Sequence, residues 1–163
     1  MNSHRSIGLI LGLAMTAAAG SAAAQTVEKR TLTIDGAKKA AAAAVAEAKK
    51  NNEGGVIAIV DDGGNLKFYL RQDGAPLVAE KISQMKAFTA VAMEKSTAEV
   101  GEISKGETPG IELVPNLIKF GGGIPIKNAK GQILGGIGVS GASKEDDAAC
   151  AQAGLDAVKA MLN

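Results

Sequence analysis

The sequence predicts an α+β domain in which helices cover a central antiparallel sheet. Segments with helical and strand-like patterns follow in the order helix, two strands, two helices, two or three strands, helix. Short turns join the paired strands, so we expect them to run antiparallel. Helices at both ends and in the middle of the chain can cover the faces of the sheet. We therefore expect one layered domain with about five strands and no internal linker or repeat.

The first half of the chain predicts a helix followed by a hairpin. Alanine and lysine dominate residues 33–50, Thr33 or Asp35 can cap the start of this helix, and the asparagines and glycines of 51–55 end it. Residues 56–60 are an almost unbroken apolar strand. The segment DGGN at 62–65 supplies the positive φ angles of a tight turn, and residues 66–71 alternate in polarity as a second, half-buried strand.

Two helices and a loop are expected in the middle of the chain. Residues 76–95 have helical spacing, and their predicted buried stripe consists of Val78, Ile82, Met85, Thr89 and Ala92. Ser96 and Glu99 have the spacing of a capping box for a short helix that ends near Ser104. Prolines and glycines interrupt the following residues 105–116, which predicts a loop.

The last third of the chain is glycine-rich. Strands are expected around 124–127 and 133–139, joined by the turn NAKG, and an amphipathic helix follows from Ser143. Glycine inside a strand weakens it, so its presence at 135, 136 and 138 indicates that another backbone comes close. We expect a helix to lie tightly across this bare patch of sheet.

The same segment contains G-x-G-x-x-G at Gly136, Gly138 and Gly141, the spacing of a dinucleotide-binding turn. That fold needs a second parallel strand after the helix, and only one helix remains in the chain. Glu145, Asp146 and Asp147 also fill the first turn of that helix, where they complement its dipole and repel phosphate. The glycines are therefore assigned to packing and turns.

The N-terminal residues have the pattern of a cleaved signal peptide. Arg5 precedes an apolar run, and Ala22-Ala23-Ala24 fits the A-x-A site of signal peptidase. We expect residues 1–24 to be removed and residues 25–163 to be periplasmic or secreted. Removing Arg5 from the 18 basic residues leaves 17, which equals the number of acidic residues, and His4 is the chain's one histidine. A neutral chain argues against nucleic acid as a partner, and imidazole chemistry is excluded from the mature protein.

Four blocks of the sequence resemble the GlcG/HbpS-like family, a haem-binding or haem-degrading domain. They are VIAIVDDGGNLKFYLRQDGA (56–75), KAFTAV (86–91), GGGIPI (121–126) and GGIGVSGASKEDDAACAQAGLDAV (135–158). They stand in the order of the family and cover nearly the whole mature chain. The resemblance implies an antiparallel sheet between helices and a homo-oligomer built from dimers, in some members an octamer. It also implies haem binding in exported members and, in other members, an association with glycolate utilisation or cobalamin enzymes.

Under this resemblance the haem site must be built without histidine. Protein ligands of haem iron are otherwise Met, Cys, Tyr or another oxygen donor, and we select Thr108 and Tyr69. Lys86 and Arg71 are candidate partners of the propionates, and Phe120 is a further candidate cofactor-binding residue. Met85, Met93, Met161 and Cys150 remain open as ligands, although each fits a packing role equally well.

Two further functions remain open. One is an enzyme or accessory protein acting on a small organic acid, in which carboxylates or Lys86 would carry proton transfer; Asp61-Asp62 is the evident acid pair, although turn formation explains it as well. The other is a non-catalytic interaction module. No catalytic residue is assigned, and no metal site is predicted apart from haem.

Overall fold

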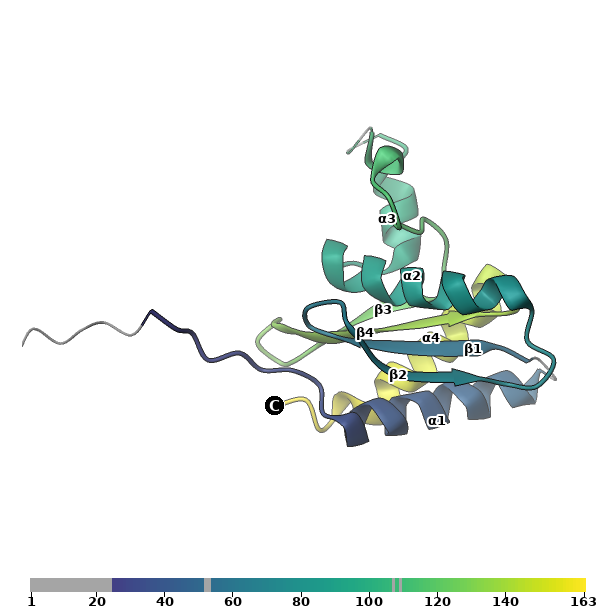
Figure 1. Ribbon diagram of the computed structural model, residues 1–163, viewed down its shortest axis with the longest axis horizontal. Coiled ribbons are helices and arrows are strands. Elements are labelled where there is room, and N and C mark those ends of the chain that lie inside the picture. The colour runs from purple at the N-terminus through teal and green to yellow at the C-terminus, as the bar shows by residue number, and fades with distance from the viewer. Residues whose placement is uncertain (1–24, 52–53, 107, 109) are drawn as a thin grey trace, which may run out of the picture.

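Four helices and a four-stranded antiparallel sheet form three layers in the computed structural model (Figure 1), which describes residues 25–51, 54–106, 108 and 110–163. Helices α1 and α4 cover one face of the sheet and α2 covers the other, while the short α3 projects outward beyond α2. The elements are α1 (Ile34–Lys50), β1 (Val56–Asp61), β2 (Leu66–Arg71), α2 (Leu77–Met93), α3 (Thr97–Ile103), the 3-10 helix η1 (Ile111–Leu113), β3 (Gly123–Lys127), β4 (Ile133–Ser140) and α4 (Lys144–Lys159).

The sheet has the strand order β2-β1-β4-β3, and every neighbouring pair is antiparallel. The α+β prediction is thus confirmed, but the described residues form four strands where about five were expected. Side chains of α2 and α3 hold the chain that leads into β3. The amide of Ile118 donates to the Thr89 hydroxyl at 2.9 Å, and the amide of Gly123 donates to the Thr97 hydroxyl at 2.9 Å.

Because β4 has glycines where it faces α2, the backbones of the strand and the helix can pack very close together. A Cβ added to Gly138 would lie 2.0 Å from the carbonyl oxygen of Ser83, and one added to Gly136 would lie 2.7 Å from that of Ala87. Real Cβ atoms do not come this close, so the bare patch is required for the helix to pack. The prediction of a helix lying across the glycines is confirmed, and the antiparallel pairing of β4 gives G-x-G-x-x-G a packing role in the described fold.

The buried face of α2 differs from the predicted stripe. Val78 is 64% exposed and Met85 only half-buried. The residues that pack inward are Ala79, Ser83, Lys86, Ala87, Thr89, Ala90 and Val91. Thr89 is buried as predicted, but most of the stripe was wrong, because it was chosen mainly for bulky apolar side chains and a helix this close to a glycine strand needs small ones.

On the opposite face, α1 and α4 pack against each other and against the sheet with an aliphatic, alanine-rich core. Gly154 of α4 lies where a Cβ would be 2.9 Å from the carbonyl oxygen of Ala40 in α1. Cys150 is buried in this core, as its packing interpretation predicted.

Residues 1–24, assigned to a signal peptide by their sequence, lie outside the described residues. None of the helices described is both long and apolar enough to cross a bilayer.

Candidate functional site

A buried ion pair lies between α2 and the first turn of α4. The ammonium Nζ of Lys86 lies 2.7 Å from Oδ2 of Asp147 and donates a second hydrogen bond to the carbonyl oxygen of Val139 at 2.9 Å. Lys86 is fully inaccessible and is the largest such side chain of the described residues. Lysine is almost never fully buried unless it is paired, so this pair is the most unusual polar feature of the core.

The glycine run before β3 makes room for Lys86. Gly122 has φ +115°, and a Cβ there would lie 2.6 Å from Nζ of Lys86. One added to Gly123 would lie 2.5 Å from the carbonyl oxygen of Lys86. The GGGIPI segment is thus shaped around the lysine.

The environment of the pair disfavours both charges. Burial lowers the pKa of Lys86, and the hydrogen bond and charge of Asp147 only partly oppose this. Burial also raises the pKa of Asp147, against the hydrogen bond from Lys86 and one from the amide of Ala142 at 3.2 Å. Two such groups in hydrogen-bond contact are chemically able to pass a proton between them.

Phe120 lies over the ammonium group of Lys86. Its ring centroid lies 5.0 Å from Nζ of Lys86, and the residue is 41% exposed. The Lys86 ammonium therefore faces the ring as a cation over an aromatic surface.

Two hollows open on either side of Phe120, and both are lined by Phe120 and Lys144. The smaller, about 240 Å³, reaches Asp147 and is walled by Val78 and Ile82 of α2. The larger, about 460 Å³, runs under α3 and is bordered by Lys105 and Lys119. Phe120 thus lines two hollows that also carry lysines. In the larger hollow, Lys105 pairs with Glu102 at 2.8 Å and Lys144 with Glu145 at 3.6 Å.

Lys86 and Phe120 are the only two of the five residues assigned to a haem site that the described structure brings into contact. Arg71 lies on β2, where it forms an ion pair with Glu80 at 2.5 Å and donates to the carbonyl oxygen of Ala75. Tyr69, two residues earlier on β2, is half-buried behind α2, and burial raises its pKa. Thr108 is exposed beyond the end of α3, and its amide donates to the carbonyl oxygen of Ile103 at 3.0 Å.

The other candidate ligands and acids are dispersed. Met85 and Met93 are half-buried, and Met161 is half-exposed near the end of α4. Oδ1 of Asp61 accepts the amides of Gly63 and Asn65, both at 2.9 Å, which is the turn role considered for the Asp61-Asp62 pair. Asp62 forms an ion pair with Lys29. No cluster of three or more metal-ligating side chains occurs in the part of the chain that the structure describes.

Asp147 is the residue of this site that the sequence analysis missed. Asp147 is one of three acidic residues in the first turn of α4, and all three were assigned to complementing the helix dipole. Glu145 is exposed and Asp146 is half-buried, whereas Asp147 is buried. The sequence contained one usable signal, a lysine within the small-residue face of α2, which needs a buried partner.

Residues 32–156 match the model of the family described as haem degrading protein HbpS-like. This chain belongs to that family. An uncharacterized 15.0 kDa protein of Citrobacter freundii is 35% identical over 100 residues, which cover 59% of this chain and 70% of that protein. Other matched relatives extend well beyond the shared region: the chain spans 59% of protein GlcG of Escherichia coli K12 and 27% of the corrinoid adenosyltransferase PduO of Salmonella typhimurium.

Two solved structures have the same fold. The crystal structure of a double mutant of HbpS from Streptomyces reticuli is 37% identical, with a TM-score of 0.77 over 86% of this chain and 97% of that one. A structure described as a PduOC:haem complex is 32% identical, with a TM-score of 0.73 over 78% of this chain and 94% of that one. The chain is thus similar over most of its length to a domain that has been crystallised with haem.

Proposed function

We propose that the protein is an exported haem-binding protein and that the porphyrin lies across Phe120. The observation that carries this proposal is the exposed aromatic ring between two lysine-rimmed hollows. Membership of the haem degrading HbpS-like family and the similarity to the PduOC:haem complex support it. Export rests on the signal-peptide pattern of residues 1–24.

The residues around Phe120 fit the chemistry of haem. A porphyrin is a flat apolar ring with two anionic propionates, so it needs apolar contact and cations. Val78, Ile82 and Phe120 supply the apolar surface, while Lys119 lines the larger hollow as a cation for a propionate. Lys144 lines both hollows and would exchange its exposed partner Glu145, at 3.6 Å, for the second propionate. In this proposal Lys86 does not bind a propionate directly, because Asp147 and Val139 already accept two of its N–H groups. Its ammonium group instead lies against the Phe120 ring. The bound iron would supply redox and ligand-binding chemistry.

An oxygen donor is the proposed iron ligand, since the single histidine of the sequence, His4, lies in the segment that we propose is removed on export. Thr108 follows α3 by a few residues, and α3 walls the larger hollow. Tyr69 is packed among Val56, Ala75 and Ala79, behind α2. This placement favours Thr108, and Tyr69 and Arg71 then have structural roles on β2.

The test is a titration of the purified protein with haem, followed by the Soret band. Phe120→Ala is expected to weaken binding at least several-fold, because it removes the aromatic contact. Phe88→Ala is the matched control, since Phe88 is also a partly exposed phenylalanine but borders a different hollow. Thr108→Val is expected to shift the Soret band and Tyr69→Phe to leave it unchanged. Absence of a saturable Soret band, or equal effects of the two phenylalanine variants, would refute the proposal.

The Lys86–Asp147 pair favours one second candidate, proton transfer on a small organic acid. A hollow of about 240 Å³ beside Asp147 is large enough for a molecule of a few heavy atoms. Here Lys86 and Asp147 replace the Asp61-Asp62 pair as the acid–base groups. If haem does not bind, a rise in melting temperature with small 2-hydroxy acids, lost in Asp147→Asn, would support this candidate.

A further inference from the structure

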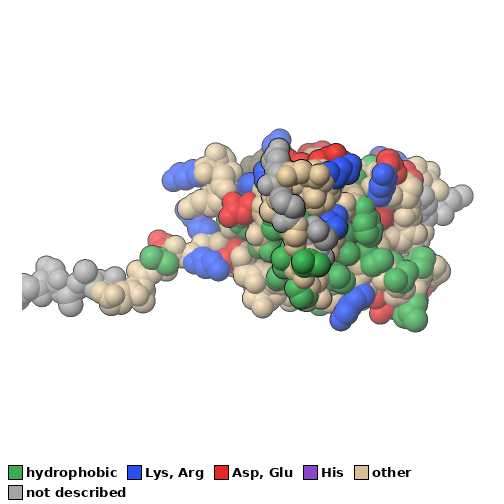
Figure 2. Space-filling view, turned by 90° about the horizontal axis from the view of Figure 1, so that it is seen from above, with side chains coloured by type: hydrophobic (Ala, Val, Ile, Leu, Met, Phe, Trp, Pro, Cys, Tyr) green, Lys and Arg blue, Asp and Glu red, His purple; other side chains and the backbone are tan. Residues whose placement is uncertain are grey.

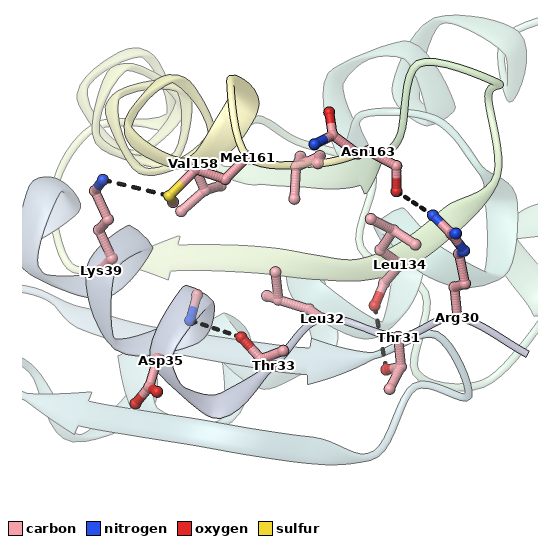
Figure 3. Close-up of a pocket in the computed structure, with 12 residues that line it drawn as sticks. Arg30, Thr31, Leu32, Thr33, Asp35, Lys39, Leu134, Val158, Met161 and Asn163 are labelled. Carbon is pink, nitrogen blue, oxygen red and sulfur yellow. Dashed lines mark hydrogen bonds between the residues drawn. The ribbon is translucent and has the colours of Figure 1, made fainter.

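A second cavity, of about 440 Å³, lies in the other helical layer, away from Phe120 (Figure 3). It is formed where the chain enters α1 and where it leaves α4. Its volume is within the range of small-molecule sites. The proposed haem site does not use any of its residues, so it needs an explanation of its own.

The inner wall of this cavity is apolar and belongs to the core. Leu32, Leu134 and Leu162 line it with exposed fractions of 4%, 5% and 8%, and Val158, also part of the lining, has no exposed surface. The amide of Leu32 donates to the carbonyl oxygen of Leu134 at 2.8 Å, so the entering chain is fixed to the start of β4. The wall is therefore preformed, as a binding surface for a hydrocarbon chain requires.

Cations stand at both ends of the apolar wall. Figure 3 shows Lys39 and Arg30 on opposite sides, with Leu32, Val158 and Met161 between them, while the carboxylate of Asp35 points away from Lys39. Nζ of Lys39 contacts only the thioether sulfur of Met161, at 3.6 Å, and no carboxylate in the described residues pairs with it. Arg30 already donates one of its five N–H groups to a main-chain oxygen of Asn163, so Lys39 is the cation proposed for the ligand.

A thioether is a weak acceptor for an ammonium group, and a carboxylate is a strong one. A ligand that brings a carboxylate to Lys39 would replace this weak contact and place its hydrocarbon chain against Met161 and the leucines of the wall. From this geometry we propose that the cavity binds an aliphatic carboxylate of medium chain length. Lys39 would bind the carboxylate and the apolar wall would bind the hydrocarbon chain, so a ligand needs both groups for full affinity.

Octanoate is the probe, and its binding to the full chain is followed by isothermal titration and by the methyl NMR signals of Leu32 and Val158. Lys39→Ala is expected to weaken binding about threefold to tenfold, which corresponds to one partly exposed charge-assisted contact. The neighbouring Lys38→Ala is the matched control, because Lys38 does not line the cavity. Met161→Glu places a carboxylate beside Lys39 and is expected to abolish binding.

Octanol and butyrate test the two contributions to binding separately. Octanol lacks the carboxylate, and butyrate lacks most of the hydrocarbon chain. Weaker binding of both than of octanoate supports the proposal. No saturable octanoate binding, equal effects of Lys38→Ala and Lys39→Ala, or methyl shifts confined to residues around Phe120 would overturn it. Haem binding is measured on the same variants and is expected to stay unchanged, so the two sites are tested independently.

Discussion

Lys86 connects the packing of the protein to its chemistry. Its ammonium has no contact with solvent, and its charge is compensated by Asp147, the Val139 carbonyl and the Phe120 ring. Removing one partner of such a pair leaves an uncompensated buried charge, which costs more than removing both.

Lys86→Met is expected to lower the free energy of unfolding by about 3 kcal/mol at pH 8. Burial already raises the pKa of Asp147 in the wild type, and loss of the lysine raises it further. A carboxyl group whose pKa is raised in the folded state contributes its full stability at pH values below the ordinary aspartate pKa. This contribution is lost as the pH rises through the folded-state pKa. The deficit should therefore be smaller at pH 5 than at pH 8 in urea denaturation.

The double variant Lys86→Met/Asp147→Leu is the control, because it removes both charges. It should recover much of the stability and show little of the difference between pH 5 and pH 8. An equal deficit at both pH values in the single variant would contradict an ionised, unpaired Asp147.

At the scale of elements, the contact between α2 and β4 depends on the absence of side chains. Gly138→Ala would place a Cβ 2.0 Å from the Ser83 carbonyl oxygen, and neither backbone can retreat without breaking its own hydrogen bonds. We expect a loss of about 3 kcal/mol in urea denaturation, at the upper end of overpacking costs. Gly106→Ala, with no atom within 4 Å of the new Cβ, should change stability by less than about 0.5 kcal/mol. Similar losses in the two variants would show that the helix is not held this close.

The elements themselves were largely predictable from local pattern. The capping box of Ser96 and Glu99 and the turn at Asn128 form as local signals indicated. Which face of α2 is buried was not predictable, because it depends on glycines in β4 some fifty residues away. The same holds for the site: Lys86 and Phe120 were selected, but the pairing of Lys86 with Asp147 spans 61 residues.

At the scale of the whole molecule, the side formed by α2 and α3 presents exposed apolar side chains. Figure 2, which views the α2 and α3 side, shows hydrophobic side chains gathered on that face. Leu77 and Val78 of α2 are 75% and 64% exposed, and Leu113 of η1 is also exposed. Apolar side chains grouped in this way commonly mark protein–protein contact, and the family resemblance implies a homo-oligomer. We therefore propose that a second copy of the chain packs against α2.

Val78→Asp is expected to convert the oligomer into a smaller species, because a carboxylate at the centre of an apolar contact would be buried without a partner. Val27→Asp is the control: Val27 is even more exposed but lies in the segment before α1, away from α2. Light scattering coupled to size-exclusion chromatography gives the mass of each species, and circular dichroism checks that both variants keep the fold. A monomeric wild type, or an oligomer that persists in Val78→Asp, would remove α2 from the assembly surface. If the oligomer persists in Val78→Asp, the exposed apolar residues beside Phe120 would contact only the proposed haem ring and not a second copy of the chain.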